Sequence, residues 1–501
     1  MKALRSLLFK PRLIPSLGVL TVLLYFGHFV LPGLHGRFNN DDPMNLYYYW
    51  SRGGWALIQG LVLFFTTYSR PMGGVYFYSL YELFGLNPYP YHVVITLLLL
   101  VNVFLANCCA RLLSGSRAVG WLCALLVSYH ARMAHLVYLP AFVFDVTCFT
   151  FFFSAFLFYL RIRTANQRLG VWQQGIFLLL YIGALEAKEM AVSLPVILLV
   201  YELLWHQPNW SLQGIWDFTK TRALPIMIAG LLTLFYVLGK TFGREPLYQV
   251  GGYEMTISVT QLIKSHMRFA NEIFYNGPDG LLGPVLWVEL AFVAWFRKEK
   301  HLKWAFPFIL FTPLPITFFV QERLGPCLYI PLFGWALALS SLLVRACDAA
   351  AHSLKLPRLH LDGARLSCLL LFAGLLFLET EHQNNRTSPG IKRSGELAWS
   401  LIEHLRSTLP PQVKPGTQIA ILSKGVLMEL DLKFITELLY HDRSVTAWLQ
   451  TKGPLSDAEL AKMQYVFTVK ERRMVLLKRP IESGPSSQTR QVPVFAERDT
   501  E

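Results

Sequence analysis

Residues 93–110 read VVITLLLLVNVFLANCCA, and none of these eighteen residues is charged. A helix that crosses the hydrocarbon core of a bilayer needs about 20 predominantly apolar residues. With its flanking residues the run extends over 90–111, which is long enough for that purpose. The run therefore predicts a transmembrane helix rather than the core helix of a water-soluble protein.

Similar apolar runs recur along the first 380 residues. We expect eleven spans, at residues 13–31, 90–111, 117–133, 140–160, 171–186, 189–205, 221–239, 281–297, 304–321, 327–344 and 365–380. Residues 72–84 are apolar and aromatic but too few to span, which favours an interfacial or re-entrant helix. The predicted fold is an all-α polytopic membrane module over residues 1–380.

The composition of the 501-residue chain supports this fold. It is 53% apolar and only 16% charged, with 36 Phe, 22 Tyr and 13 Trp. Ordinary soluble chains carry about 25% charged residues. These values exclude a disordered chain, a coiled coil and a small secreted scaffold. The net charge of +14 is explained by loop charges that orient membrane helices, so no nucleic-acid partner is expected.

The loop charges predict an orientation. When the loops before residue 380 are assigned to alternating sides, 19 Lys and Arg residues fall on the side of the N-terminus and 10 on the other side. Cytoplasmic loops carry the excess of basic residues, so the N-terminus is expected to be cytoplasmic. Residues 32–40 lack a small-x-small cleavage site, so the first span is expected to stay uncleaved.

Residues 381–501 are polar and contain no run long enough to span a bilayer. We expect a soluble α/β domain there, joined by a linker over 384–390, with a disordered end from residue 482. Eleven spans place this domain on the extracytoplasmic side. All seven cysteines precede it, and we expect them to be buried free thiols.

The first outer loop, residues 32–90, contains two adjacent carboxylates, Asp41 and Asp42. A carboxylate at this depth can act as a general base on an acceptor hydroxyl or amine. A pair can also hold a divalent metal ion. However, Asn-Asp-Asp-Pro is equally a good helix start, with proline at the first helical position. The two functions are compatible, and the sequence leaves both open.

Three basic residues are candidates to bind a phosphate. Arg70 precedes the 72–84 helix, Lys188 lies at the tip of a tight hairpin, and Arg323 lies in a short outer turn. Guanidinium and ammonium groups at headgroup depth suit a lipid phosphate. They could equally anchor the chain to lipid headgroups or pair with nearby acids. We expect support from neighbouring residues, namely Glu189, Tyr68 and Arg132.

Two further features are less specific. Asp145 lies within the fourth span, where an ionisable group usually has a function, but it is close enough to the outer side to face water. A second outer loop covers 240–280, and residues 257–275 in it have weak helical amphipathicity, as in a helix lying on the outer leaflet or capping the spans.

Several motifs together resemble a known family. They are Tyr68-Ser69-Arg70-Pro71, LYELFGLNPYPYH at 80–92, LEAKEMAVSLP at 185–195 and ERLGPCLYIPL at 322–332, all following the acid pair. Over roughly residues 10–345 the chain resembles the GT-C class of integral membrane glycosyltransferases. It looks most similar to the branch related to protein O-mannosyltransferases and the lipid A aminoarabinose transferase.

The resemblance implies a bacterial inner-membrane enzyme that transfers a sugar on the periplasmic face. The donor would be a sugar linked to a polyprenyl phosphate, and the acceptor a glycan, lipid or protein. Asp41 or Asp42 would act on the acceptor, while Arg70, Lys188 and Arg323 would hold the donor phosphate. The family often has an acid-Glu pair where this chain has Asp-Asp, so the identity of the base and the need for a metal stay open.

The alternatives are a lipid-linked glycan transporter or flippase, a non-catalytic scaffold, and a polysaccharide polymerase or ligase. A transporter should show repeated halves and charges near mid-membrane. The sequence shows no clear repeat, and its notable charges lie at the outer rim, which favours the transferase. Inversion at the anomeric carbon is expected because no second carboxylate is placed as a nucleophile.

Overall fold

The computed structural model describes residues 13–39, 41–63, 70–242, 254–353, 358–422, 434–449, 455–470 and 473–478. The chain divides into two compact units, Met1–Ser400 and Leu401–Glu501. This division falls twenty residues after the boundary proposed from the sequence. The first unit is helical, and the second contains a small sheet, so each is described by itself.

The described helices include five that are long and apolar enough to cross a membrane, as expected of an integral membrane protein. They are Ser16–His35, Pro88–Ser114, Pro140–Thr164, Leu212–Phe242 and Gly325–Ala350. Shorter apolar helices cover Arg117–Ser128, Val171–Ala187 and Leu282–Phe296. The structure therefore bears out a polytopic helical module but does not confirm the count of eleven spans.

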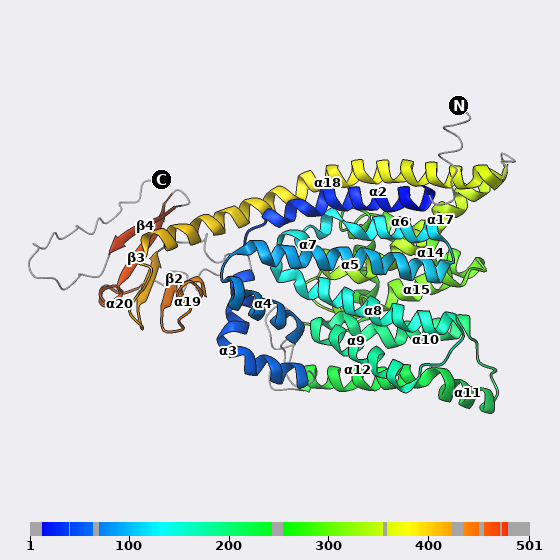
Figure 1. Cartoon of the computed structure of the whole chain (residues 1–501), viewed down its shortest axis with the longest axis horizontal. Coiled ribbons are helices and arrows are strands. Elements are labelled where there is room, and N and C mark those ends of the chain that lie inside the picture. Colours follow the sequence, from blue (N-terminus) through cyan, green and yellow to red (C-terminus); the bar gives the residue numbers. More distant parts are fainter. Residues whose placement is uncertain are drawn as a thin grey trace, which may run out of the picture. The chain divides into compact units, whose positions relative to one another are not determined.

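The long helices of the first unit lie roughly side by side (Figure 1). They are α2 (Leu13–Val30), α5 (Pro88–Ser114), α6 (Arg117–Ser128), α8 (Val143–Thr164), α9 (Val171–Ala187), α10 (Leu194–Trp205), α12 (Leu224–Phe242), α14 (Leu282–Phe296), α15 (Lys300–Phe311), α17 (Tyr329–Ser353) and α18 (Arg358–Thr408). Helix α5 packs against both α6 and α8. This central position agrees with the uncharged run that predicted it.

Other elements connect these helices along the chain. They are η1 (Leu31–His35), α3 (Asp42–Val62), α4 (Pro71–Phe84), η2 (Ala131–Met133), α7 (His135–Tyr138), η3 (Pro140–Phe142), η4 (Glu189–Ser193), α11 (Leu212–Phe218), η5 (Thr219–Ala223), α13 (Val259–Ile273), α16 (Leu314–Thr317) and η7 (Gly325–Leu328). Figure 1 shows α3 and α4 at one end of the bundle and α11 at the other. The two ends therefore carry different loops.

Local sequence explains where α5 begins and ends. The Asn87 side chain accepts a hydrogen bond from the backbone N–H of Tyr89, and Pro88 occupies the first turn. Proline fits there because its missing N–H would have no helical partner. At the other end Gly115 adopts a left-handed conformation, with φ of 70°, which glycine tolerates without strain. The helix is thus bounded by its own cap residues.

The helix predicted at 72–84 is α4, and it packs against α3, α8 and α9. Gly73 lies directly against α8, because a Cβ atom added to it would sit 1.9 Å from a ring carbon of Phe144. A side chain at this position would therefore push the two helices apart. Since Arg70 immediately precedes α4, the same contact fixes the position of Arg70.

We expect Gly73→Ala to lower the free energy of unfolding by about 1–3 kcal/mol, because the new methyl group overlaps the Phe144 ring. Thermal unfolding of the purified protein in detergent measures this change. Gly230→Ala in α12 is the matched control, since a Cβ atom there would meet nothing within 4 Å. Equal melting temperatures for the two variants would show that α4 and α8 do not pack as described.

Helix α18 contradicts the predicted linker at 384–390, because it runs without interruption from Arg358 to Thr408 with Pro389 inside it. Two polar residues of the predicted linker bond to other parts of the first unit. Tyr129 donates to the Asn384 side-chain oxygen at 2.6 Å, and Thr387 donates to the Ala131 carbonyl at 3.2 Å. The polar composition of this segment predicted a linker, because the sequence does not show these distant hydrogen-bond partners.

The second unit contains a four-stranded sheet in the order β2-β1-β3-β4. Strand β1 (Gln418–Leu422) pairs in parallel with β2 (Thr446–Leu449) and β3 (Tyr465–Lys470), while β4 (Arg473–Lys478) is antiparallel to β3. This sheet agrees with the α/β domain expected there, and the short helix α20 (Asp457–Lys462) lies between β2 and β3 along the chain. Helix α19 covers Ile435–Tyr440. The predicted disordered end lies outside the described residues.

The cysteine prediction needs one correction. Cys347 at the end of α17 and Cys368 in α18 form a disulfide, and the other five cysteines are free. Sequence gave no reason to pair them, because they are 21 residues apart and only the folding of α18 beside α17 brings them together. Cys108 and Cys327 are only partly buried.

Candidate functional site at the α3–α4 end of the bundle

Asp42 ties the first outer loop to the start of α8. Its side chain is fully buried, and its two oxygens accept hydrogen bonds from the backbone N–H groups of Asn39 at 2.7 Å and Ala141 at 2.5 Å. Burial raises the pKa of Asp42, and these two hydrogen bonds oppose the rise. A buried carboxylate that bonds two separate backbone segments holds the loop against the start of α8.

Asp41 occupies the N-cap position of α3 but makes no side-chain capping bond. It is exposed, in contrast to Asp42. The protein around its carboxyl group partly desolvates it and raises its pKa, while the charge of nearby Arg323 acts in the opposite direction. Arg323 is thus close enough to act on the charge of Asp41, although the two residues are distant in sequence.

Arg70 and Glu189 form a two-pronged ion pair. Arg70 Nε lies 3.2 Å from Glu189 Oε1, and Nη2 lies 2.9 Å from Oε2, with both side chains 16% exposed. The guanidinium also lies 5.4 Å from the centre of the Phe144 ring. The positive charges of Arg70 and Lys240 both favour the ionised carboxylate of Glu189. Glu189 is thus an anion that orients Arg70.

Lys188 pairs with Asp145 rather than with its hairpin neighbours. Its ammonium lies 2.6 Å from Asp145 Oδ1 and 3.4 Å from Cys327 Sγ, and the residue is buried. Burial lowers the pKa of Lys188, but Asp145 outweighs it, so the net direction is upward. Lys188 therefore stays positively charged. Arg70 is close enough to act electrostatically on the same ammonium.

Lys240 is a further cation that the sequence did not single out. It is buried at the end of α12, with its ammonium 5.3 Å from the centre of the Tyr236 ring. Its charge acts on both Glu186 and Glu189. A single lysine at the outer end of an apolar helix was the only signal, and a lysine there usually anchors a span at the interface.

The predicted residues thus converge on one region. The start of α8 links them, because Ala141 holds Asp42 and Asp145 holds Lys188. Arg132 forms a different ion pair, with its Nε 3.9 Å from a Glu272 oxygen. Tyr68 lies outside the described residues.

The acid pair does not fit a divalent metal ion in this structure, because both oxygens of Asp42 are taken by backbone N–H groups. In the described ranges no group of three or more His, Cys, Asp or Glu side chains could hold a metal.

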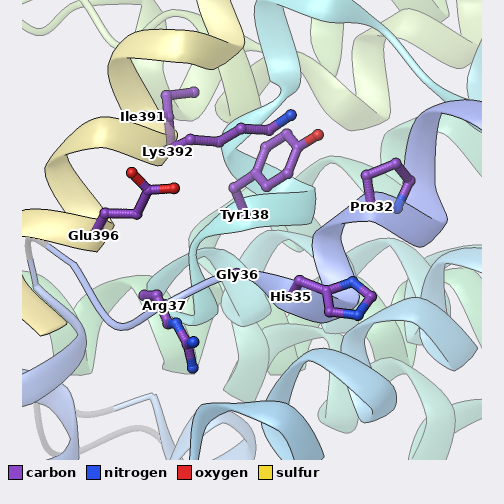
Figure 2. A pocket seen from close by; sticks show the side chains of 9 residues that line it. Pro32, His35, Gly36, Arg37, Tyr138, Ile391, Lys392 and Glu396 are labelled. Carbon is purple, nitrogen blue, oxygen red and sulfur yellow. The ribbon is translucent and has the colours of Figure 1, made fainter.

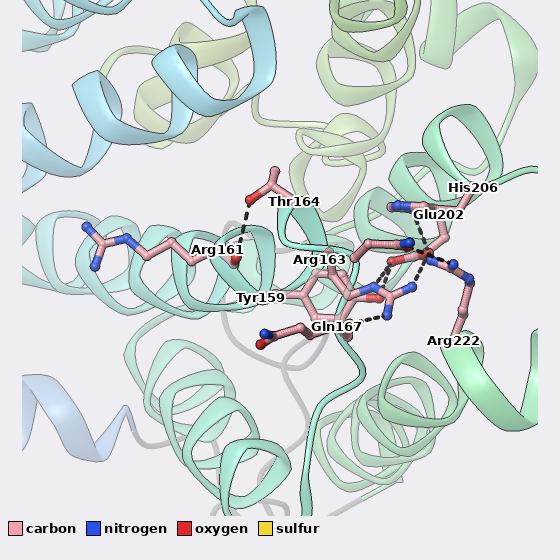
Figure 3. A network of polar contacts seen from close by, with 9 residues as sticks. Tyr159, Arg161, Arg163, Thr164, Gln167, Glu202, His206 and Arg222 are labelled. Carbon is pink, nitrogen blue, oxygen red and sulfur yellow. Dashed lines mark hydrogen bonds and ion pairs between the residues drawn. The ribbon is translucent and has the colours of Figure 1, made fainter.

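A second charged network lies at the other end of α8 (Figure 3). Glu202 is fully buried and accepts hydrogen bonds from Arg163 Nε at 2.6 Å, Arg163 Nη2 at 2.9 Å and the Tyr159 hydroxyl at 2.8 Å. His206 and Arg222 approach the same carboxylate at 3.1 and 3.7 Å. This network joins α8, α10 and η5, and no sequence motif indicated it.

Comparisons with known proteins give a structural similarity only. No protein-family model and no curated protein match the sequence. Two solved structures are similar: ArnT from Cupriavidus metallidurans in the apo state, and the same protein bound to undecaprenyl phosphate. Each has 13% identity and a TM-score of 0.49, and they cover 90% and 92% of this chain and 92% and 97% of their own. ArnT is the lipid A aminoarabinose transferase, a GT-C enzyme of the branch that the motifs resemble.

Proposed function

We propose that the chain is a membrane glycosyltransferase that moves a sugar from a polyprenyl-phosphate donor to an acceptor hydroxyl or amine. The observation that carries this proposal is the meeting of three kinds of group at one end of the bundle. Arg70 is held by Glu189, Lys188 is held by Asp145, and the exposed Asp41 lies near Arg323. Phosphate binding and acceptor activation need these groups within one site.

The basic residues would bind the leaving phosphate. Arg70 and Arg323 are partly exposed, so they would contact the phosphate directly. Lys188 is buried and would add its positive charge to the site without direct contact. The phosphate gains negative charge as its bond to the sugar breaks. Cations fixed in advance therefore stabilise the transition state more than the bound donor.

Asp41 is the proposed general base, since its carboxylate is exposed while both oxygens of Asp42 are occupied. Its carboxylate takes the proton from the acceptor hydroxyl or amine as that atom attacks the anomeric carbon. The bond between this carbon and the phosphate oxygen breaks, and polyprenyl phosphate leaves with the electron pair. A single displacement of this kind inverts the anomeric centre.

The membrane placement is part of the same proposal. The 19-to-10 distribution of basic residues favours a cytoplasmic N-terminus, and with it an outer location for the α3–α4 end. There a polyprenyl chain can stay in the bilayer while its phosphate reaches Arg70 at headgroup depth. We place the protein in a bacterial inner membrane, with the second unit in the periplasm.

The test of this function is a reaction with the purified full chain in nanodiscs. A polyprenyl-phosphate sugar is supplied together with a membrane extract containing candidate acceptors. We expect release of polyprenyl phosphate and a glycosylated product with inverted stereochemistry. Movement of the intact lipid-linked sugar between leaflets without cleavage would contradict the proposal and indicate a transporter. Reaction only with diphosphate-linked glycans would indicate a polymerase or ligase.

A pH profile tests the pairing of Asp41 with Arg323. A general base must be ionised, so transfer should fall as the pH drops through the raised pKa of Asp41. Because Arg323 lowers that pKa, Arg323→Ala should shift the acidic limb of kcat/KM to higher pH. Arg386→Ala, in α18, is the charge-matched control and should leave the limb in place. If the acidic limb does not shift in Arg323→Ala, Arg323 does not act on the pKa of the general base.

A further inference from the structure

A cavity of about 320 Å³ lies in the first unit, beside the loop that carries Asp41. Its lining side chains come from η1 and the following loop, from α7 and from α18 (Figure 2). The ionisable groups among them are His35, Arg37, Lys392 and Glu396. The cavity is large enough for one sugar unit, since sites for small molecules usually measure about 300–1,000 Å³.

The cavity is connected to the proposed base through short stretches of chain. Arg37 precedes Asp41 by four residues, a span of at most about 14 Å. On the other wall, Tyr138 precedes Ala141, the residue whose N–H holds Asp42, by three positions. Between the two walls, Ser394 of α18 donates to the Asn39 side-chain oxygen at 2.9 Å. A ligand in the cavity therefore lies within the length of a short glycan from Asp41.

The cations of the cavity rest on aromatic rings. The Lys392 ammonium lies 5.0 Å from the centre of the Tyr138 ring, and the Arg37 guanidinium lies 5.0 Å from the Trp399 ring. In the described part of the chain, no ion pair joins either cation to a carboxylate, although Glu396 follows Lys392 by one helical turn. Figure 2 shows the Arg37 guanidinium turned away from Lys392. An incoming anion would therefore meet Lys392 first.

The charges of the lining favour a ligand with one negative charge. With His35 neutral, the positive groups outnumber the negative groups by one. A sugar carboxylate has a charge of −1 and hydroxyls that can donate to Glu396. A phosphate monoester carries about −1.5 to −2 at pH 7 and would be repelled more strongly by Glu396.

We infer that this cavity binds an acidic sugar, of the hexuronic acid class, as part of the glycosyl acceptor. The assignment to the acceptor rests on the proposed function, because it uses the nearness of the cavity to Asp41. The carboxylate contacts Lys392, the sugar hydroxyls face Glu396, and Arg37 adds attraction at longer range.

Direct binding tests the inference without any turnover. The purified full chain in nanodiscs is titrated by calorimetry with D-glucuronate, with neutral glucose and with glucose 1-phosphate. We expect glucuronate to bind more tightly than either of the others. Equal binding of glucose, tighter binding of glucose 1-phosphate, or no binding of glucuronate at millimolar concentration would each overturn the inference.

Variants locate the site. Lys392→Ala should weaken glucuronate binding about tenfold or more, as expected for loss of one charged hydrogen bond. Arg37→Ala should weaken it less, and Glu396→Gln should reduce the preference for glucuronate over glucose 1-phosphate. Arg393→Ala is the matched control, because Arg393 is an exposed neighbour on α18 that does not line the cavity. Equal binding by Lys392→Ala and Arg393→Ala would overturn the assignment.

The same titration separates the two claims. Arg70→Ala should bind glucuronate as the wild type does, because Arg70 does not line the cavity. Loss of glucuronate binding in Arg70→Ala would place the anion at the phosphate site and overturn the inference. If glucuronate binds as expected but no sugar is transferred from any polyprenyl-phosphate donor, the acidic-sugar site is supported and the proposed glycosyltransferase function is wrong.

Discussion

Arg70→Ala is expected to reduce kcat for sugar transfer by about 10²–10³-fold, the usual effect of removing one group that stabilises developing negative charge. Arg70 is the basic residue whose geometry is best defined, since Glu189 holds it in two places and Phe144 lies beneath it. The change is measured as release of polyprenyl phosphate by the purified variant. Arg70→Lys should recover only part of the rate, because an ammonium cannot make two parallel bonds to phosphate.

Loss of activity could also follow from misfolding, because Arg70→Ala leaves the Glu189 carboxylate without its main partner. The double variant Arg70→Ala/Glu189→Gln removes that unpaired charge. We expect the double variant to recover the melting temperature of the wild type but not its activity. If it regains transfer, Arg70 supports the structure only and the proposed phosphate grip is wrong.

Glu202→Ala is expected to destabilise the protein by about 3–5 kcal/mol, the usual cost of removing one partner of a buried ion pair. Arg163 is 2% exposed in its side chain, and without Glu202 its charge has no anion in the described network. Thermal unfolding in detergent measures the effect. Glu202→Gln should be less damaging, because the amide oxygen can still accept one of the hydrogen bonds.

Glu403→Ala provides the comparison for an exposed pair. Glu403 bonds Arg406 at 2.8 Å, with both side chains about 45% exposed, and such pairs contribute about 0–1 kcal/mol. The folded fraction of Glu202→Ala should still transfer sugar, because Arg163 lies eighteen residues beyond Asp145 along α8, about 27 Å away. A melting temperature for Glu202→Ala equal to that of Glu403→Ala would refute the structural role of this network.

The sequence predicted the elements whose signal is local. The uncharged run at 93–110 lies within α5, and residues 72–84 became α4. In each case hydrophobicity and cap residues within the segment decide the outcome. The linker predicted at 384–390 was wrong. These residues belong to α18, and their hydrogen-bond partners, such as Tyr129, lie more than 250 residues away in sequence.

The candidate site was predicted as a set of residues but not as a set of pairs. The hairpin at 185–195 suggested mutual pairing among its charges or a lysine facing phosphate. The structure instead pairs Glu189 with Arg70, 119 residues away, and Lys188 with Asp145, 43 residues away. Only the packing of α4 and α8 against the hairpin decides this. The same packing buries Asp42 and leaves Asp41 exposed. The sequence could not predict this difference, because the two residues are adjacent.

The most direct test of the account measures donor binding and turnover together in Asp41→Asn. The variant in nanodiscs is mixed with a radiolabelled polyprenyl-phosphate sugar and acceptor, and bound donor and released polyprenyl phosphate are counted in one sample. We expect donor binding like that of the wild type and a rate lower by about 10²–10⁴-fold, the typical contribution of a general base. Turnover at the wild-type rate would contradict it.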